Sequence, residues 1–285
     1  MEYFLDMPEK YTDYDKAYFV ILPVPYDGTS TFVKGADKGP QAIIDASDSI
    51  ELYDVEEGVE IHNFGIHTAA PIMENKTPDA MVNAVYNRVK QYLNDNKTVV
   101  LLGGEHSVSI GAIRAHAEKY SRLSVLQLDA HADLRKEYHG SIYNHACVMN
   151  RAKEVAEVVQ VGIRNVCSEE KKYIQSDKIF YAHQMRNNNE WMEKAIEQLN
   201  EYVYISLDLD CFDPSILPST GTPLPGGMTW WQVLDFIDMV IRKKQVIGFD
   251  IVELCPNPSE KSSDVLAAVL TYKMMIKILK KQKKL

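Results

Sequence analysis

Short apolar segments recur along the chain and predict buried β-strands. They are rich in Val, Ile and Leu, and they cover residues 17–24, 98–102, 123–128, 158–163, 203–207 and 246–252. Segments that are apolar at most positions, without a strict alternation of polar residues, are typical of strands that are covered on both faces. We therefore expect a buried sheet with helices above and below it.

The segments between these strands carry helix signals. Thr77 is a suitable N-cap, and apolar residues recur every four positions from Val85 to Leu93. Ser107 likewise predicts the cap of a helical segment over residues 108–120. The alternation of strands and helices predicts the covering layers that the apolar strands need.

The order of these elements defines the expected fold class. Alternating strands and helices predict a three-layer α/β/α fold with a mostly parallel central sheet. The sequence shows no internal repeat and no low-complexity linker, so we expect a single domain over residues 1–285. In such folds ligands bind beyond the carboxyl ends of the strands, which directs the search for chemistry to those ends.

Composition and charge narrow the class of protein. A formal net charge of −9 and a pI near 5.4 speak against a nucleic-acid-binding surface and leave room for a cationic ligand. The sequence has neither a long apolar run nor a basic signal-peptide start, so we expect no membrane partner and a cytoplasmic location. Widely spaced cysteines favour a reducing compartment; they are Cys147, Cys167, Cys211 and Cys255.

Metal-type ligands follow the apolar segment 123–128. Asp129, His131 and Asp133 alternate with two alanines, and in an extended backbone alternate side chains share one face. The alternative is a half-exposed strand with polar residues facing water, but aspartate is depleted in strands. The pattern therefore favours three ligands that converge.

A second pair of acids follows the segment 203–207. Asp208 and Asp210 again stand at positions i and i+2, although such a pair can also form a turn in which Asp bonds its own backbone. A third element, Gly103-Gly104-Glu105-His106-Ser107, follows the segment 98–102 and places His106 at a strand end. Its spacing does not fit a phosphate-binding loop.

Four aspartates in one cleft require compensating positive charge. Their mutual repulsion would raise their pKa values unless cations stood between them. Two divalent ions supply that charge and lower the pKa of a water between them toward 7. Carboxylates and imidazoles without a thiolate favour a hard ion such as manganese, so we expect two Mn²⁺ ions per chain.

The three motifs together resemble the signatures of the ureohydrolase family, which includes arginase and agmatinase. They occur in the family's order, and further family-like stretches extend the resemblance over nearly the whole chain from about Val20. These stretches include Tyr26-Asp27-Gly28-Thr29-Ser30, Gly221-Thr222-Pro223-Leu224-Pro225-Gly226-Gly227 and Gly248-Phe249-Asp250-Ile251-Val252-Glu253.

The resemblance implies roles for individual residues. It assigns one manganese ion to His106, Asp129, Asp133 and Asp208, and the other to Asp129, His131, Asp208 and Asp210. It implies that Glu253 orients the guanidinium nitrogens of a cationic substrate and that His145 shuttles a proton. It also implies a homo-oligomer, a trimer or a hexamer.

The resemblance is closest to short bacterial and archaeal agmatinases. It predicts the cleavage of agmatine to putrescine and urea, with N1-aminopropylagmatine, guanidinobutyrate, guanidine or arginine as alternative substrates. Arg135 stands where arginases carry an Asn that holds the substrate carboxylate. Because a cation in the pocket would repel a diamine, we expect Arg135 to face outward or to pair with an acid such as Glu137.

Three other classes of function compete with a dinuclear hydrolase. A metal-free enzyme would use Cys147 or Cys211 as nucleophile after activation by His145, but it leaves the six metal-type ligands unexplained. A mononuclear deacylase would not require both Asp133 and Asp210. A catalytically silent binding protein would keep the fold without turnover, and an assay of urea release distinguishes it.

Overall fold

All strands of the structure, a computed structural model that describes residues 3–186 and 188–283, belong to one parallel sheet. Its eight strands are ordered β2-β1-β3-β8-β7-β4-β5-β6, and every neighbouring pair is parallel. The strands are β1 Phe19–Val24, β2 Ile66–Thr68, β3 Thr98–Gly103, β4 Leu123–Leu128, β5 Glu157–Ile163, β6 Ile179–Tyr181, β7 Tyr202–Asp208 and β8 Gln245–Val252.

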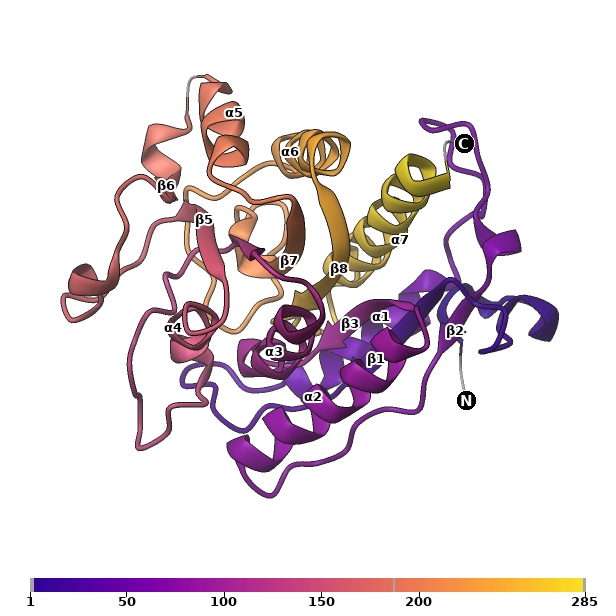
Figure 1. The fold of residues 1–285 in the computed structure, drawn as a ribbon, viewed down its shortest axis with the longest axis horizontal. Coiled ribbons are helices and arrows are strands. Elements are labelled where there is room, and N and C mark those ends of the chain that lie inside the picture. The colour runs from indigo at the N-terminus through magenta and orange to yellow at the C-terminus, as the bar shows by residue number, and fades with distance from the viewer. Residues whose placement is uncertain (1–2, 187, 284–285) are drawn as a thin grey trace.

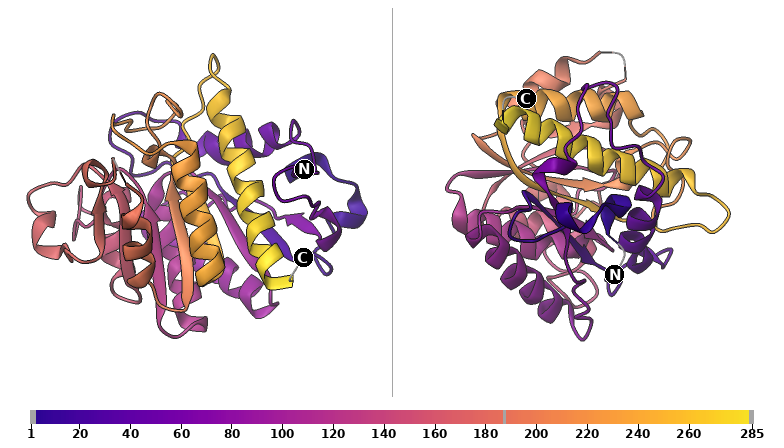
Figure 2. Two further views of the ribbon diagram at one scale, coloured as in Figure 1. Left: turned by 90° about the horizontal axis from the view of Figure 1, so that it is seen from above. Right: turned by 90° about the vertical axis from the view of Figure 1, so that its right-hand side faces the viewer.

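Helices cover both faces of the sheet (Figures 1 and 2). One layer consists of α1 Gly39–Ser47, α5 Glu190–Glu197, α6 Trp230–Lys243 and α7 Ser262–Lys283. The other consists of α2 Pro78–Asn94, α3 Ser109–Lys119 and α4 Val148–Ala152. The predicted three-layer α/β/α fold with a parallel central sheet is therefore confirmed.

The apolar strands divide their side chains between two cores. In β1, Phe19 and Ile21 pack into the core under α1 and α7, whereas Val20 and Leu22 pack into the core under α2 and α3. Successive side chains of a strand point to opposite faces, so a strand covered on both sides must be largely apolar at every position and not at alternate ones. This explains why the central strands are mostly apolar segments in the sequence.

The predicted elements agree with the structure for the long segments. The segment 123–128 coincides with β4, and α2 begins where Thr77 Oγ1 accepts a hydrogen bond from Ala80 N at 3.0 Å. The edge strands β2 and β6 were not predicted. Each has three residues, too few to show a pattern.

The order of the sheet determines where the predicted ligands meet. The strands β3, β8, β7 and β4 are consecutive in the sheet, and each is followed or ended by a predicted site residue. Since parallel strands end at the same edge, these residues share one rim.

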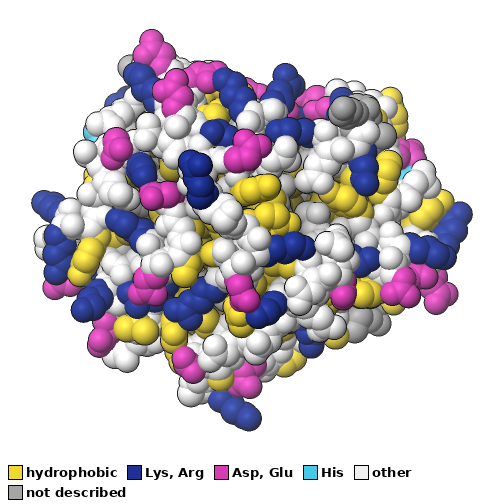
Figure 3. All heavy atoms as spheres, in the orientation of Figure 1, with side chains coloured by type: hydrophobic (Ala, Val, Ile, Leu, Met, Phe, Trp, Pro, Cys, Tyr) yellow, Lys and Arg dark blue, Asp and Glu magenta, His cyan; other side chains and the backbone are white. Residues whose placement is uncertain are grey.

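The surface carries charges of both signs. On the face that Figure 3 shows, acidic and basic side chains are interspersed. None of the helices within residues 3–186 and 188–283 is long and apolar enough to cross a membrane.

Candidate metal centre

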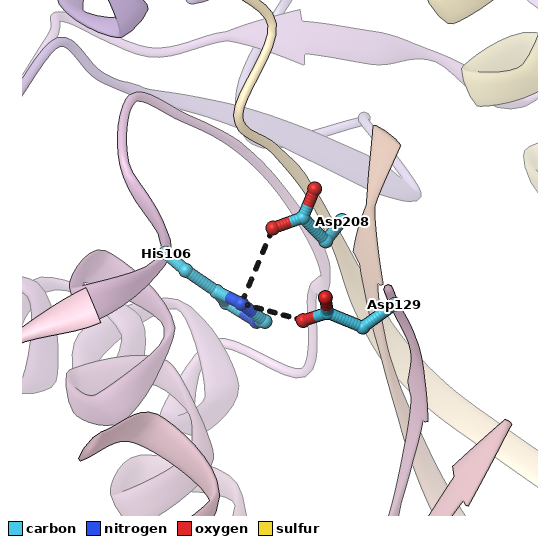
Figure 4. Close-up of side chains that lie close together, drawn as sticks. All are labelled: His106, Asp129 and Asp208. Atoms are coloured by element: carbon cyan, nitrogen blue, oxygen red, sulfur yellow. Dashed lines mark ion pairs between the residues drawn. The ribbon is translucent and has the colours of Figure 1, made fainter. Parts of the chain in front are cut away.

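The predicted ligands converge at the carboxyl-terminal edge of the sheet. His106 follows β3, Asp129 follows β4 and Asp208 ends β7, and Figure 4 shows both carboxylates pointing toward the His106 ring. His106 Nδ1 lies 3.2 Å from Asp129 Oδ2, 3.0 Å from Asp133 Oδ2 and 3.6 Å from Asp208 Oδ2. Beside them, His131 Nδ1 lies 2.9 Å from Asp210 Oδ2 and 3.6 Å from Asp129 Oδ1.

Two groups of potential metal ligands share one carboxylate. Among the described residues, one group is His106, Asp129 and Asp208 and the other is Asp129, His131 and Asp210, with ligand atoms within 4.8 Å of one another in each group. Asp129 belongs to both, as expected of a bridging ligand. Asp133 lies beside the first group, and a second bridge by Asp208 stays a prediction.

The backbone around these aspartates differs from the extended strand that the alternation predicted. Strand β4 ends at Leu128, and Asp133 has a φ of 51°, a left-handed conformation that is uncommon for residues other than glycine. His131 N donates to Asp129 Oδ1 at 2.6 Å, which closes a tight turn. The side chains therefore converge because the chain turns, and not because they alternate on a strand.

The second pair of acids also forms a turn. Leu209–Cys211 is a short 3-10 helix, and Asp208 Oδ1 accepts a hydrogen bond from Asp210 N at 2.8 Å. Asp208 and Asp210 thus point to neighbouring ligand groups, although they do not share the face of a strand. The turn and the metal-ligand interpretations of this motif are both correct, since the turn aims the ligands.

Ser107 is not the helix cap that the sequence predicted. His106–Val108 forms a 3-10 turn before α3, and Glu105 caps that turn instead. Glu105 Oε2 accepts from Ser107 N at 2.9 Å and Glu105 Oε1 from Ser107 Oγ at 2.6 Å. A buried acid therefore takes the place of the hydroxyl cap and fixes the turn that presents His106.

A buried relay determines which nitrogen of His106 faces the carboxylates. Ser206 Oγ donates to Asp250 Oδ1 at 2.9 Å, so its oxygen accepts from His106 Nε2 at 2.9 Å. That contact places the ring proton on Nε2. His106 Nδ1 has no hydrogen-bond partner among the described residues although it is buried, which suits a nitrogen that ligates a metal.

Two buried glutamines support the shared carboxylate, and sequence reasoning missed them. Gln127 Nε2 donates to Asp129 Oδ2 at 2.7 Å, and Gln160 Nε2 donates to Gln127 Oε1 at 2.6 Å and to Ala132 O at 2.7 Å. Both are large polar residues inside largely apolar strands, which is the signal that could have revealed them. The pairing of β4 with β5 places them side by side.

The imidazoles of the centre outweigh burial and lower the pKa of Asp129, but they do not balance Asp133 and Asp208. Burial and the charge of Asp129 raise the pKa of Asp133 to about 7. Burial and the neighbouring acids raise the pKa of Asp208 well above its usual range. Burial lowers the pKa of His131, but Asp210 and Asp129 outweigh it and raise that pKa to about 11. The acids attract any available cation, and a divalent ion fits this donor set of carboxylates and imidazoles.

Glu253 lies beside this centre in a constrained backbone. It follows β8 with a φ of 66°, and its Oε1 accepts a hydrogen bond from His106 N at 2.8 Å. Burial and the charge of Glu105 raise its pKa well above the usual value. The carboxylate both fixes the His106 turn and faces the pocket.

A pocket of about 230 Å³ opens onto the ligands. His145 is part of its wall, with Nδ1 3.3 Å from Thr29 Oγ1 and Nε2 3.5 Å from Thr31 Oγ1. Burial lowers the pKa of His145 to about 4, so its imidazole is uncharged at neutral pH. The pocket is lined by Thr31, His131, Ala132, Asp133, Arg135, Tyr138, His145, Ala146, Asn165, Cys167, Glu170, Asp208, Thr222 and Glu253.

Arg135 also lines the pocket, and its acidic partner is not the one suggested by the sequence. Its Nη1 lies 3.6 Å from Glu169 Oε2, and its guanidinium lies over the ring of Tyr138. Glu169 follows β5 and comes close only through the pairing of β4 with β5, whereas Glu137 is an exposed neighbour in sequence.

The cysteines of the rival metal-free mechanism are poorly suited to nucleophilic attack. Burial raises the pKa of the Cys147 thiol to about 12 and that of Cys211 well above its usual range. A nucleophilic cysteine requires the opposite shift, toward the thiolate. Both side chains are fully buried and belong to the packing around the centre.

The chain is similar to known proteins over most of its length. The family profile described as "Arginase family" matches residues 17–277. The N(1)-aminopropylagmatine ureohydrolase of Synechocystis sp. is 40% identical, with 94% of this chain and 91% of that protein covered. The agmatinase of Pyrococcus horikoshii is 32% identical, with 94% of each covered. The crystal structure of agmatine ureohydrolase of Thermoplasma volcanium has a TM-score of 0.86 at 30% identity, covering 95% of this chain and 93% of that one.

Proposed function

Since this chain belongs to the arginase family, we propose that it hydrolyses the guanidino group of a polyamine-like substrate, and of N1-aminopropylagmatine in preference to agmatine. The coarser activity follows from the family: the protein is a ureohydrolase, which cleaves a guanidino C–N bond. The observation that carries the proposal is the pair of ligand groups that share Asp129 beneath an acidic pocket.

We propose that two Mn²⁺ ions bind at these two ligand groups. His106, Asp129, Asp133 and Asp208 would hold one, and Asp129, His131, Asp208 and Asp210 the other. Both groups contain only histidine and aspartate, a donor set that favours a hard ion. Divalent ions at such a site supply Lewis acidity and ionise water near neutral pH.

The remaining residues of the pocket would bind the substrate and move a proton. The carboxylate of Glu253 suits the planar fork of a guanidinium, and its hydrogen bond from His106 N holds it in position. His145 is uncharged at neutral pH and can accept the proton of the attacking water. It can then deliver that proton to the nitrogen of the leaving amine, which must acquire one.

The choice between N1-aminopropylagmatine and agmatine as the preferred substrate rests on the sequence identity to the named relatives. The sequence predicts agmatine, with N1-aminopropylagmatine as an alternative. The relative named for N(1)-aminopropylagmatine is 40% identical to this chain, whereas the agmatinase is 32% identical. We therefore place N1-aminopropylagmatine first and keep agmatine as the second candidate.

The proposal is tested by urea release from a panel of guanidino compounds. The Mn²⁺-loaded protein is assayed with N1-aminopropylagmatine, agmatine, arginine, guanidinobutyrate and guanidine. We expect the highest kcat/KM for N1-aminopropylagmatine. Urea release that is fastest with arginine, or that is absent with every compound, contradicts the proposal. Inactivation by iodoacetamide that added Mn²⁺ does not change would instead support a cysteine mechanism.

A further inference from the structure

The wall of the pocket contains a positively charged side chain of the protein itself, Arg135. The guanidinium carbon of Arg135 lies 4.3 Å from the ring centroid of Tyr138, and its Nη1 lies 3.6 Å from Glu169 Oε2. Arg135 N donates to Ala146 O at 3.0 Å, which joins this loop to the His145 turn. The guanidinium therefore lies beside the space that a cationic substrate must enter.

An aromatic face next to a carboxylate is a general receptor for organic cations. The ring attracts the cation through its quadrupole, and the carboxylate pairs with it. Here both groups are engaged by Arg135. The ion pair is long and the Glu169 side chain is 77% exposed, so solvent screens the attraction and another cation can replace the guanidinium at little cost.

We propose that Tyr138 and Glu169 form a subsite for the distal ammonium of a guanidino-polyamine, and that Arg135 is a specificity-determining residue that disfavours shorter amines. This inference rests on the proposed function and identifies the part of the pocket that distinguishes substrates by the length of their amine chain. A long tail carries its terminal ammonium to the ring and the carboxylate, where it replaces the guanidinium.

A short tail meets a different environment. Its only ammonium corresponds to the inner ammonium of the longer substrate, and it has no second ammonium that could replace the guanidinium. Arg135 therefore keeps its place beside the pocket, and like charges repel. The guanidino end of either substrate meets the same residues, His131, Asp208 and Glu253. The difference between long and short amines therefore arises at the rim and not at the metal ligands.

The test compares kcat/KM for N1-aminopropylagmatine and agmatine in three variants of the Mn²⁺-loaded enzyme. Glu169→Gln is expected to lower kcat/KM for N1-aminopropylagmatine about three- to tenfold, mainly through KM. The loss for agmatine is expected to be smaller, because agmatine does not reach Glu169 and senses only the unpaired charge of Arg135. Arg135→Gln is expected to raise kcat/KM for agmatine by a similar factor. The matched control is Glu137→Gln, which makes the same charge change as Glu169→Gln on an exposed side chain of the Arg135 loop that is not the ion-pair partner of Arg135.

The outcomes separate the inference from the proposed function. If the wild-type enzyme releases urea from N1-aminopropylagmatine but Glu169→Gln and Arg135→Gln change both substrates equally, the subsite is refuted while the proposed function stands. If the wild type prefers guanidinobutyrate and Arg135→Gln abolishes that preference, Arg135 binds a carboxylate and the inference is wrong. If the wild type releases no urea from either amine, the proposed function fails first. Thermal unfolding of each variant verifies that it folds.

Discussion

Two acidic clusters of this molecule differ in whether the chain supplies the balancing positive charge. On α7, three lysines face three acids of the 54–57 segment: Lys273, Lys277 and Lys280 face Asp54, Glu56 and Glu57. Burial raises the pKa of Glu57, but Lys277 and Lys280 outweigh it and lower that pKa to about 2. At the sheet edge, four aspartates and Glu253 are grouped around two histidines, His106 and His131.

The difference shows how a structural cluster can be distinguished from a binding site. In the α7 cluster the lysines balance the acids, and their ion pairs attach the 54–57 segment to α7. The central cluster is incomplete, and burial with mutual repulsion raises the pKa of Asp208 and of Glu253. Burying several carboxylates together is costly unless a cation lies between them, so the central cluster has the composition of a site that could hold a metal ion.

The largest expected effect comes from the carboxylate that both ligand groups share. Asp129→Asn should lower kcat by on the order of a thousandfold, because it removes charge from both proposed metal sites at once. Steady-state urea release measures the effect. Asp235→Asn, an exposed acid on α6, is the control and should keep full activity. Full turnover in Asp129→Asn would show that the shared carboxylate has no role.

Removal of metal should have the next largest effect, on stability. A ligand at about one hundred times its Kd stabilises the folded state by about 2.7 kcal/mol per site. Chelation should therefore lower the Tm of the wild-type protein by several degrees, as calorimetry would record. In the Asp129→Asn/Asp208→Asn double variant, Tm should not depend on Mn²⁺. Equal Tm values of the wild type with and without the ion would count against the metal centre.

Neutralising one central acid should stabilise the metal-free protein. The pKa of Asp208 is higher in the folded state than in the unfolded state. At pH 8 the carboxylate is therefore ionised at lower cost in the unfolded chain, which favours unfolding. Asp208→Asn in the presence of EDTA should therefore increase the free energy of unfolding by about 1–2 kcal/mol. Urea denaturation at pH 8 gives the value. A loss of stability would mean that positively charged groups of the protein already compensate the charge of Asp208.

Neutralising one acid of the α7 cluster should have a small effect of the opposite sign. Glu57→Gln should lower the free energy of unfolding by about 0.5–1 kcal/mol at pH 7, because it removes the carboxylate that Lys277 and Lys280 share, although Lys277 keeps its ion pair with Asp238. The folded pKa of Glu57 is lowered, so its contribution is fully present above about 4.5 and is lost as the pH falls toward 2. The difference between wild type and variant should disappear over that range in urea denaturation.

The sequence predicted the parts of the molecule that depend on local patterns. Leu123–Leu128 is apolar except for Ser124 and Gln127, so its boundaries were correct, and the acids after it stood out against that background. The family resemblance supplied His145 and Glu253, whose roles stay predictions. The three-residue edge strand Ile179–Tyr181 lacked such a pattern and was not predicted.

The sequence could not provide what depends on the order of strands in space. Gln127 donates a hydrogen bond to Asp129, and Gln160 on the neighbouring strand β5 holds the Gln127 side chain in place. The contact between the two glutamines exists only because β4 and β5 are neighbours in the sheet. The pairing of Arg135 with Glu169 likewise joins loops after two different strands. The left-handed backbone at Asp133 escaped prediction, because the alternation suggested an extended strand there.

The number of ions that the folded chain binds is the decisive observation for the proposed metal centre. Protein freed of metal with a chelator is dialysed against Mn²⁺, and the bound metal is measured by elemental analysis for the wild type and for Asp129→Asn. We expect two ions per wild-type chain and fewer in the variant. A wild-type chain that is active in urea release but holds no stoichiometric metal would contradict it.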